Sequence, residues 1–293
     1  MMPMAENSAF GGDPRWDDIQ EMATVAEDVG FDGISFADHF VSRPDDPAGV
    51  RGFWEVFTII TAVAATTKRV VLSPLVACTA YRNPFLLAKI AESIDEVSHG
   101  RLLLGIGAGW SKPDFDMAGL RFDYRVSRFE ETVQILYPLL REGHAEFSGT
   151  YVSATDARNI PRGPRAEIGG VPIMMGTKGE RMMALTAQYA DAWNTVYPRE
   201  PQEIADLLAK LDAACVAIGR DPKTLMKTVG SNIAMDGYLG FRPNPMQGTP
   251  EEIVTQMLAF RDAGIEHLVA SLDPCTPQTI AAFGRMLELL DAA

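Results

Sequence analysis

The chain is short of basic residues and of long apolar runs. Lysine and arginine together number 26 against 39 aspartates and glutamates, which gives a formal net charge of -13 at pH 7. Because a nucleic-acid surface needs a basic face, this balance argues against a nucleic-acid partner. No apolar run approaches the ~20 residues of a membrane-spanning helix, and no basic, apolar leader is evident. We therefore expect no membrane association.

Cysteine and histidine are scarce as well. Cys78, Cys215 and Cys275 are widely spaced and odd in number, so they indicate neither a disulfide framework nor a metal motif. This use of cysteine is typical of a reducing cytoplasm, where we expect the protein to reside. None of the four histidines has the spacing of a zinc site, and we expect no metal. The hydrophobic content of 47% is that of a globular protein with a large core.

The most informative stretch that is present is an apolar run ending in glycines. Residues 102–106 are bounded by glycines and favour a strand buried on both faces of a parallel sheet. Gly105, Gly107 and Gly109 stand at its carboxyl end, where α/β proteins bind ligands, and Trp110 adds a flat apolar wall. A glycine-rich turn that merely leaves the sheet is the alternative, since short glycine patterns are weak signals.

Strand and helix patterns alternate along the chain. We count eight strand candidates, most of them followed by a segment with apolar residues at helical spacing. Among the candidates are residues 33–37, 70–77, 102–106, 171–175, 191–195, 228–235 and 267–272. Alternating β and α units imply a parallel sheet, and eight of them fit a closed (α/β)8 TIM barrel. No Gly-x-Gly-x-x-Gly follows the first strand, so the barrel is favoured over a doubly wound open sheet.

Residues 144–170 do not fit this alternation. They are too many for a tight connection between a helix and a strand, and they contain a hairpin pattern around residues 147–151 and a loop rich in proline, arginine and glycine. We expect an insertion there, after the fourth helix. Residues 1–293 are expected to form a single barrel domain that includes it.

Five short motifs follow one another in a fixed order. They are Asp38-His39-Phe40, Tyr81-Arg82-Asn83-Pro84, Ser98-His99-Gly100-Arg101-Leu102, Gly105-Ile106-Gly107-Ala108-Gly109-Trp110 and Tyr189-Ala190-Asp191-Ala192-Trp193-Asn194. Together they resemble the luciferase-like monooxygenase superfamily, and more narrowly its oxidoreductases that use the deazaflavin coenzyme F420. The resemblance covers nearly the whole chain. It implies a barrel of the bacterial luciferase-like type with an insertion, usually a homodimer, that acts on a small molecule.

The same resemblance implies where the cofactor binds. Family members hold the ring in the barrel mouth against the third strand, at a non-proline cis peptide that by position falls at Leu75-Val76. The loop Gly176-Thr177-Lys178-Gly179 matches the family's phosphate site. Backbone amides at the start of the helix that follows would favour such an anion. The implied cofactor-binding residues are Asp38, Leu75, Val76, Ala108, Gly109, Trp110, Gly176, Thr177, Lys178 and Gly179.

His39 matches the histidine that deazaflavin-dependent members carry after their second strand, and it is the expected catalytic residue. An imidazole gives or takes a proton near neutral pH. Asp38 would orient its ring or contact the cofactor, although neighbours on an extended strand point to opposite sides. From the residues alone, a half-buried histidine held by the backbone is the alternative reading of His39.

Trp110 is a departure from part of the family. Some deazaflavin-dependent sugar-phosphate dehydrogenases have a glutamate directly after the glycine-rich strand, where this chain has Trp110. The difference argues against a sugar phosphate and favours a more apolar or aromatic substrate. A packing role for Trp110 under the loop is the alternative.

The leading functional hypothesis is an F420-dependent oxidoreductase that transfers a hydride between the deazaflavin and a small organic substrate. An FMN-dependent monooxygenase using reduced flavin and oxygen is the nearest alternative, and a cofactor-binding barrel without turnover is a second. F420 also carries an anionic oligoglutamate tail. Candidates to contact this tail are the loop arginines Arg43, Arg51, Arg162 and Arg165.

Overall fold

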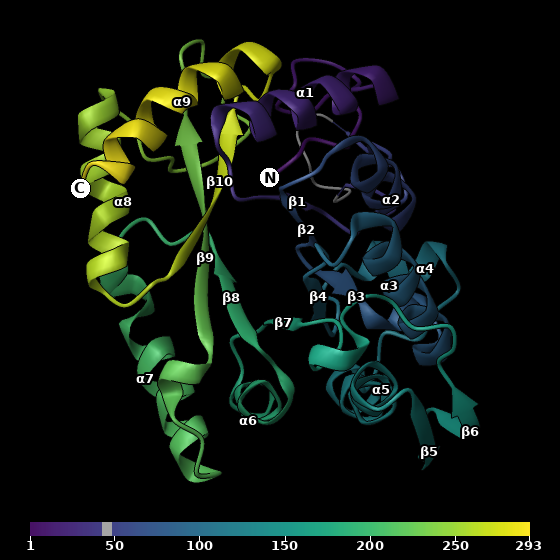
Figure 1. The fold of residues 1–293 in the computed structure, drawn as a ribbon. Helices are drawn as coiled ribbons and strands as arrows, with labels where there is room; N and C mark the ends of the chain where they lie inside the picture. Colours follow the sequence, from purple (N-terminus) through teal and green to yellow (C-terminus); the bar gives the residue numbers. More distant parts are fainter. Residues whose placement is uncertain (43–48) are drawn as a thin grey trace.

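A ring of parallel strands surrounded by helices forms the centre of the protein (Figure 1). The computed structural model describes residues 1–42 and 49–293. One sheet has the order β10-β9-β8-β7-β4-β3, a second pairs β1 with β2, and all these pairs are parallel. The strands are β1 (Gly33–Phe36), β2 (Val71–Pro74), β3 (Ala77–Cys78), β4 (Leu104–Gly107), β7 (Ile173–Gly176), β8 (Ala192–Val196), β9 (Met226–Ala234) and β10 (His267–Asp273).

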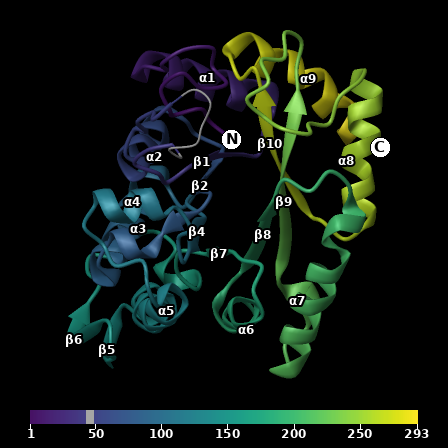
Figure 2. The same cartoon turned by 180° about the vertical axis from the view of Figure 1, so that it is seen from behind.

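The helices lie outside the ring (Figures 1 and 2). They are α1 (Trp16–Val29), α2 (Val56–Thr66), α3 (Pro84–Ser98), α4 (Lys112–Met117), α5 (Arg125–Arg141), α6 (Glu180–Tyr189), α7 (Ala205–Ala217), α8 (Pro250–Asp262) and α9 (Pro277–Asp291). Local sequence explains their starts: the Asn83 side chain accepts the N–H groups of Phe85 and Leu86, and Pro84 occupies the first turn of α3. Among the described residues, no helix has the length and apolar character to cross a membrane.

Two sets of backbone hydrogen bonds close the ring. The amino group of Met1 donates to the Ala270 carbonyl of β10 at 2.6 Å, and the Met2 N–H donates to the Ser35 carbonyl of β1 at 2.8 Å. On the other side, the Leu103 N–H donates to the Leu72 carbonyl at 2.9 Å and so joins β2 to the start of β4. The predicted (α/β)8 barrel is confirmed, with extended N-terminal chain between β1 and β10 in place of a regular strand.

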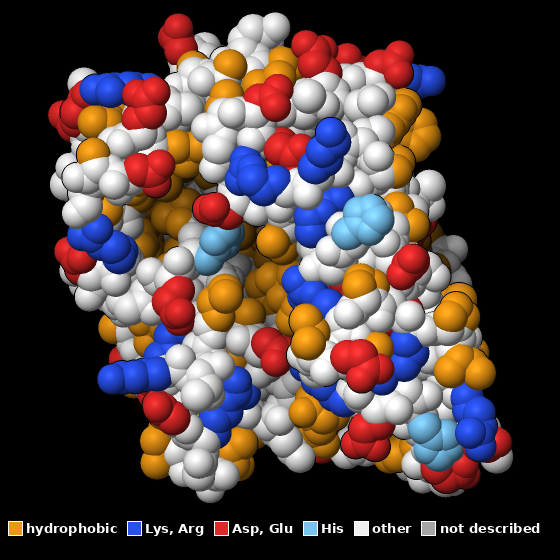
Figure 3. All heavy atoms as spheres, viewed as in Figure 1, with side chains coloured by type: hydrophobic (Ala, Val, Ile, Leu, Met, Phe, Trp, Pro, Cys, Tyr) orange, Lys and Arg blue, Asp and Glu red, His pale blue; other side chains and the backbone are white. Residues whose placement is uncertain are grey.

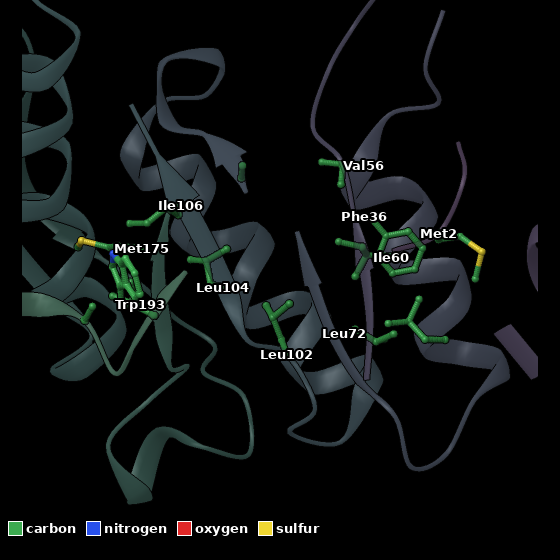
Figure 4. Packing of buried hydrophobic residues seen from close by; sticks show 14 of the residues in the cluster. Met2, Phe36, Val56, Ile60, Leu72, Leu102, Leu104, Ile106, Met175 and Trp193 are labelled. Atoms are coloured by element: carbon green, nitrogen blue, oxygen red, sulfur yellow. The ribbon is translucent and has the colours of Figure 1, made fainter. Parts of the chain in front are cut away.

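The apolar run that begins at Leu102 is buried, as predicted. Leu102, Leu104 and Ile106 are each 0% exposed. Figure 4 shows these side chains between the Met175 and Trp193 group and the group on β1, β2 and α2. Each fully buried side chain of this size stabilises the fold by about 1.5–3 kcal/mol. Because side chains alternate along a strand, Leu104 and Ile106 face the helices and the intervening glycines face the barrel interior.

The segment 144–170 leaves the β/α alternation. It contains the antiparallel hairpin of β5 (His144–Ser148) and β6 (Ser153–Arg158), which lies beside α5 outside the ring (Figures 1 and 2). The Glu131 carboxylate of α5 accepts the N–H groups of Thr150, Tyr151 and Val152 at the hairpin turn. The following loop is tied to α3, because Glu92 accepts the Gly163 N–H at 2.6 Å. The hairpin falls where the sequence predicts one.

Candidate active site

A cavity of about 230 Å³ lies at the carboxyl ends of β1, β3, β4 and β7. All the catalytic and cofactor-binding residues predicted from the sequence line it except Gly179, which caps α6 directly after Lys178. The structure thus gathers His39, Asp38, Leu75, Val76, Ala108, Gly109, Trp110, Gly176, Thr177 and Lys178 around one space. Gly107, expected at the ligand end of its strand, lines the cavity too, and the prediction missed four further lining residues, namely Ala77, Cys78, Tyr81 and Met182.

The peptide bond between Leu75 and Val76 is cis, as predicted. The Val76 side chain packs on glycine positions of the neighbouring strands. A Cβ on Gly107 would lie 2.8 Å from Val76 Cγ2, and one on Gly176 would lie 3.1 Å from the same side chain. A Cβ on Gly105 would meet the Pro74 carbonyl oxygen at 2.1 Å. The expectation that these glycines serve close approach of a ligand is therefore incomplete, because Gly105 and Gly107 make room for the bulge itself.

His39 has a buried partner that the sequence did not indicate. Its Nδ1 lies 2.7 Å from Oδ2 of Asp114, whose side chain is 0% exposed. The Tyr81 hydroxyl donates to the same oxygen at 3.1 Å. Burial alone would raise the pKa of Asp114, but hydrogen bonds from His39 and Val41 lower it to about 2. Asp114 is 75 residues from His39 in the chain, and no local motif signals such a pairing.

Asp38 does not orient the His39 ring, which corrects one of the two roles expected for it. Its carboxylate accepts two hydrogen bonds from Arg82, at 2.7 and 3.0 Å, and the Cys78 N–H at 2.9 Å. Arg82 also donates to Glu55 at 2.7 Å and lies over the Phe57 ring. Asp38 therefore fixes the end of β1 to β3 and to the start of α3, and still lines the cavity.

Aromatic rings flank His39. The Trp110 ring meets His39 edge-on with centroids 5.2 Å apart, and the Phe53 ring lies 5.6 Å from His39. Trp110 is 60% exposed, so it is not packed beneath the loop. Gly109 before it has φ +79° and leaves no room for a Cβ, which would lie 2.5 Å from Cys78 Sγ. Trp110 thus stands at the cavity as an apolar wall.

The turn from Gly176 to Gly179 leads from β7 into α6. Thr177 is buried: its hydroxyl lies 3.3 Å from that of Thr186, and its carbonyl accepts the Trp193 Nε1–H at 3.1 Å. Lys178 is exposed and lines the cavity. The first N–H groups of a helix lack intrahelical partners, and together with the Lys178 ammonium they fit an anion such as a cofactor phosphate.

Two of the arginines predicted to contact the cofactor tail are at the wrong end of the barrel. Arg165 donates to the Leu102 carbonyl at 3.3 Å, before β4 begins, and Arg162 pairs with Glu92 of α3 at 3.4 Å. The loop that carries them returns along α3 to the amino ends of the strands, and this return explains the error. Arg51 donates to the Asn7 carbonyl at 2.7 Å. Arg43 lies outside the described residues.

A second, larger cavity of about 450 Å³ lies at the amino ends of the strands. Gly33, Val71, Leu103 and His267 mark these strand starts, and hydrophobic side chains of α8 and α9 complete the lining. Figure 3 shows hydrophobic side chains in a hollow near the middle of the face drawn in Figure 1. The residues of the carboxyl-end cavity do not take part in it.

The fold and the carboxyl-end site together define an α/β-barrel protein with a binding cavity at the barrel mouth, built on a non-proline cis peptide and a histidine. The chain belongs to the luciferase-like monooxygenase family, whose model matches residues 1–237. The resemblance drawn from the five motifs is confirmed at the level of the family.

Relatives in this family carry different activities in their names. The chain is 30% identical over 185 residues to the pyrimidine monooxygenase RutA of Klebsiella pneumoniae subsp. pneumoniae, covering 59% of this chain and 49% of that protein. It therefore spans about half the length of these curated relatives. It is 25% identical over 227 residues to the 5,10-methylenetetrahydromethanopterin reductase of Archaeoglobus fulgidus, covering 78% of this chain and 63% of that protein.

Solved structures share the fold. An F420-dependent secondary alcohol dehydrogenase in complex with an F420-acetone adduct superposes with a TM-score of 0.80 at 20% identity, covering 94% of this chain and 96% of that one. At this identity the likeness shows the fold alone. The family relationship makes the protein a member of a group of oxidoreductases and monooxygenases.

Proposed function

We propose that the protein is an F420-dependent oxidoreductase that transfers a hydride between the deazaflavin and a small organic substrate. One observation carries the proposal: His39, held by the buried Asp114, lines the same cavity as the cis peptide between Leu75 and Val76. A proton-transfer group thus lies in the same cavity as the residues expected to hold the cofactor, as proton transfer beside hydride transfer needs.

The residues of the cavity fit a deazaflavin or flavin. Leu75, Val76, Ala108 and Gly109 line the cavity where the ring would bind. The turn from Gly176 to Gly179 and Lys178 would hold the phosphate. When bound, such a cofactor supplies the hydride donor or acceptor.

The chain's own side chains would bind, orient and move a proton. His39 would give a proton to the substrate or take one from it, and the rings of Trp110 and Phe53 beside it would exclude water. Since tryptophan stands directly after Gly109, the wall beside His39 offers no carboxylate at that place. This favours an uncharged, apolar or aromatic substrate over a sugar phosphate.

An FMN-dependent monooxygenase is the second candidate, and the similarity to the pyrimidine monooxygenases favours it. FMN and F420 share the tricyclic ring and the first phosphate, so the turn at 176–179 does not discriminate between them. The feature that favours F420 is His39, which matches the deazaflavin-dependent branch in the motif Asp38-His39-Phe40.

Side-by-side fluorescence titrations with F420 and FMN test the proposal. We expect micromolar or tighter binding of F420, weaker binding of FMN, and F420 affinity that falls as salt is raised, because Lys178 and the start of α6 would attract the anionic phosphate. Equal or tighter binding of FMN, with oxygen consumption once the flavin is reduced, would favour the monooxygenase. If neither ligand binds, the cofactor assignment fails.

A further inference from the structure

We propose that Asp114 is a positioning residue that holds the neutral His39 ring with its proton on Nδ1 and the Nε2 lone pair toward the cavity. The consequence for turnover rests on the proposed function, but the placement of the proton does not. The inference concerns a residue of α4 that neither the motifs nor the family resemblance indicated.

The contact between the two side chains fixes the position of the proton. The His39 Nδ1 and the Asp114 Oδ2 are 2.7 Å apart, and the Asp114 side chain is 0% exposed. An ionised carboxylate has only acceptors, so a hydrogen bond at this distance requires the proton on Nδ1. In a neutral imidazole the other nitrogen then has the lone pair. Among the described residues, none hydrogen-bonds Nε2, and the ring lines the cavity.

The surroundings of Asp114 keep it an acceptor. Its Oδ1 accepts the backbone N–H groups of Phe40 and Val41, at 3.1 and 3.0 Å, and its Oδ2 accepts the Tyr81 hydroxyl at 3.1 Å. These donors and His39 offer a hydrogen to the carboxylate from four directions. Each of the four bonds is lost or weakened if the carboxylate takes a proton, so the ionised form is the one that this site stabilises.

The Asp114 carboxylate fixes the segment that follows β1 and the His39 imidazole relative to each other. Phe40 and Val41 directly follow His39, so one carboxylate holds both the backbone that carries the ring and the ring itself. With Nε2 free to accept, the neutral ring takes a proton from a substrate O–H: that bond breaks, the N–H bond forms, and the electron pair stays on oxygen. The resulting imidazolium then lies against the Asp114 carboxylate, which stabilises its charge.

Asp114→Asn tests the placement, because the structure fixes the orientation of the new amide. The two backbone N–H groups at Oδ1 require an oxygen there, so the amide NH2 takes the place of Oδ2 and donates to His39 Nδ1. The proton of the neutral ring must then move to Nε2. Tyr81→Phe is the matched control, since it removes a donor to Oδ2 and leaves the acceptor unchanged.

The measurement is 15N NMR of histidine-labelled protein without cofactor, at a pH where the ring is neutral, with His39 assigned from a His39→Gln spectrum. We expect the Nδ1–H tautomer in the wild type and in Tyr81→Phe, and the Nε2–H tautomer in Asp114→Asn. A wild-type spectrum of the Nε2–H tautomer overturns the proposal, and this result does not depend on whether either variant folds.

Turnover of the enzyme loaded with F420, followed as reduction of F420 by a panel of small primary, secondary and aromatic alcohols, then tests the positioning role. We expect Asp114→Asn to lower kcat by about 10²–10⁴-fold, with the KM of the substrate and the Kd of F420 within roughly threefold of wild type. A tautomer change without a fall in kcat overturns the positioning role. Absence of any turnover in the wild type, with the expected NMR spectra, overturns the proposed function and leaves the assignment of the proton in place.

Discussion

The cavity at the amino ends of the strands encloses about 450 Å³, roughly twice the 230 Å³ of the cavity at the carboxyl ends. The larger one is lined mainly by hydrophobic side chains, including Met257, Phe283 and Leu287. The smaller one brings together His39 with its buried carboxylate, a cis peptide and a helix start. Judged by size and apolar lining, the functional site would lie at the amino ends of the strands. Judged by converging polar groups, it would lie at the carboxyl ends.

This difference shows which feature identifies a site in a barrel of this kind. A hydrophobic cavity can remain simply because α8 and α9 pack imperfectly against the amino ends of the strands. A charged side chain such as Asp114, by contrast, is buried only where hydrogen-bond donors compensate its charge. The carboxyl ends of barrel strands are also where loops of different strands converge. We therefore assign the chemistry to the smaller cavity.

The largest expected effect is a loss of kcat on replacing the histidine of the carboxyl-end cavity, compared with replacing the histidine of the amino-end cavity. His39→Ala removes the proton-transfer group at the carboxyl end, and we expect kcat to fall by about 10²–10⁴-fold while the Kd of F420 changes far less. His267→Ala at the amino-end cavity is the control, for which we expect kcat within about twofold of wild type. Steady-state kinetics of both variants with F420 check this. Equal losses would remove the distinction between the two ends.

The next largest effect is on the free energy of unfolding, when the buried ion pair between Arg82 and Asp38 is broken. Arg82→Leu leaves Asp38, whose side chain is 3% exposed, as a buried charge without its cation, and we expect the free energy of unfolding to fall by about 3–5 kcal/mol. The exposed pair Lys112–Asp116 serves as the control, and Lys112→Ala should cost about 0–1 kcal/mol. Denaturant titrations measure both. Similar costs would mean that Asp38 is well solvated in the absence of Arg82.

Acid should weaken the carboxyl-end site through Asp114. Its pKa is about 2 in the folded protein, below the ordinary aspartate value of 3.8, so its contribution to stability is present above about pH 4 and is lost as the pH falls toward 2. We expect this loss to be on the order of 2 kcal/mol. Unfolding titrations of wild type and Asp114→Asn across this range should differ in slope. Parallel slopes would indicate that the pKa of Asp114 is the same in the folded and the unfolded protein.

The smallest expected effect concerns the glycines beneath the bulge. Gly107→Ala would place a Cβ 2.8 Å from the Val76 side chain, and we expect the Kd of F420 to rise by about tenfold as the bulge shifts. Adding Val76→Ala should restore much of the affinity. Gly105→Ala is the contrasting variant, because its Cβ meets the Pro74 carbonyl, which Val76→Ala does not move. Fluorescence titrations measure the affinities, and a Gly107→Ala variant that Val76→Ala does not rescue would show that Val76 is not the contact.

The sequence predicts much of the fold because its strand signals are local. The apolar run before Gly105, the alternation of elements and the motif at Tyr81–Pro84 each depend on neighbouring residues, and the structure confirms the barrel that they imply. The motif at 98–102 proves structural, since Arg101 is buried and donates to the carbonyls of Ala64 and Val70. The homodimer, the cytoplasmic location and the single domain over 1–293 stay predictions.

The parts of the site that the sequence could not predict depend on contacts between distant segments. Asp114 meets His39 because α4, which follows β4, packs against the segment after β1, and Asp38 pairs with Arg82 instead. The loop with Arg162 and Arg165 carries no signal of its direction, so its return to the amino ends was not foreseeable.

A crystal structure determined with F420 bound tests the central claim most directly, because it compares the two cavities in one measurement. We predict electron density for the ring in the carboxyl-end cavity, against Leu75 and Val76, with the phosphate at the turn from Gly176 to Gly179. Density for the ligand in the amino-end cavity, or a carboxyl-end cavity that stays empty at saturating F420, would contradict the assignment.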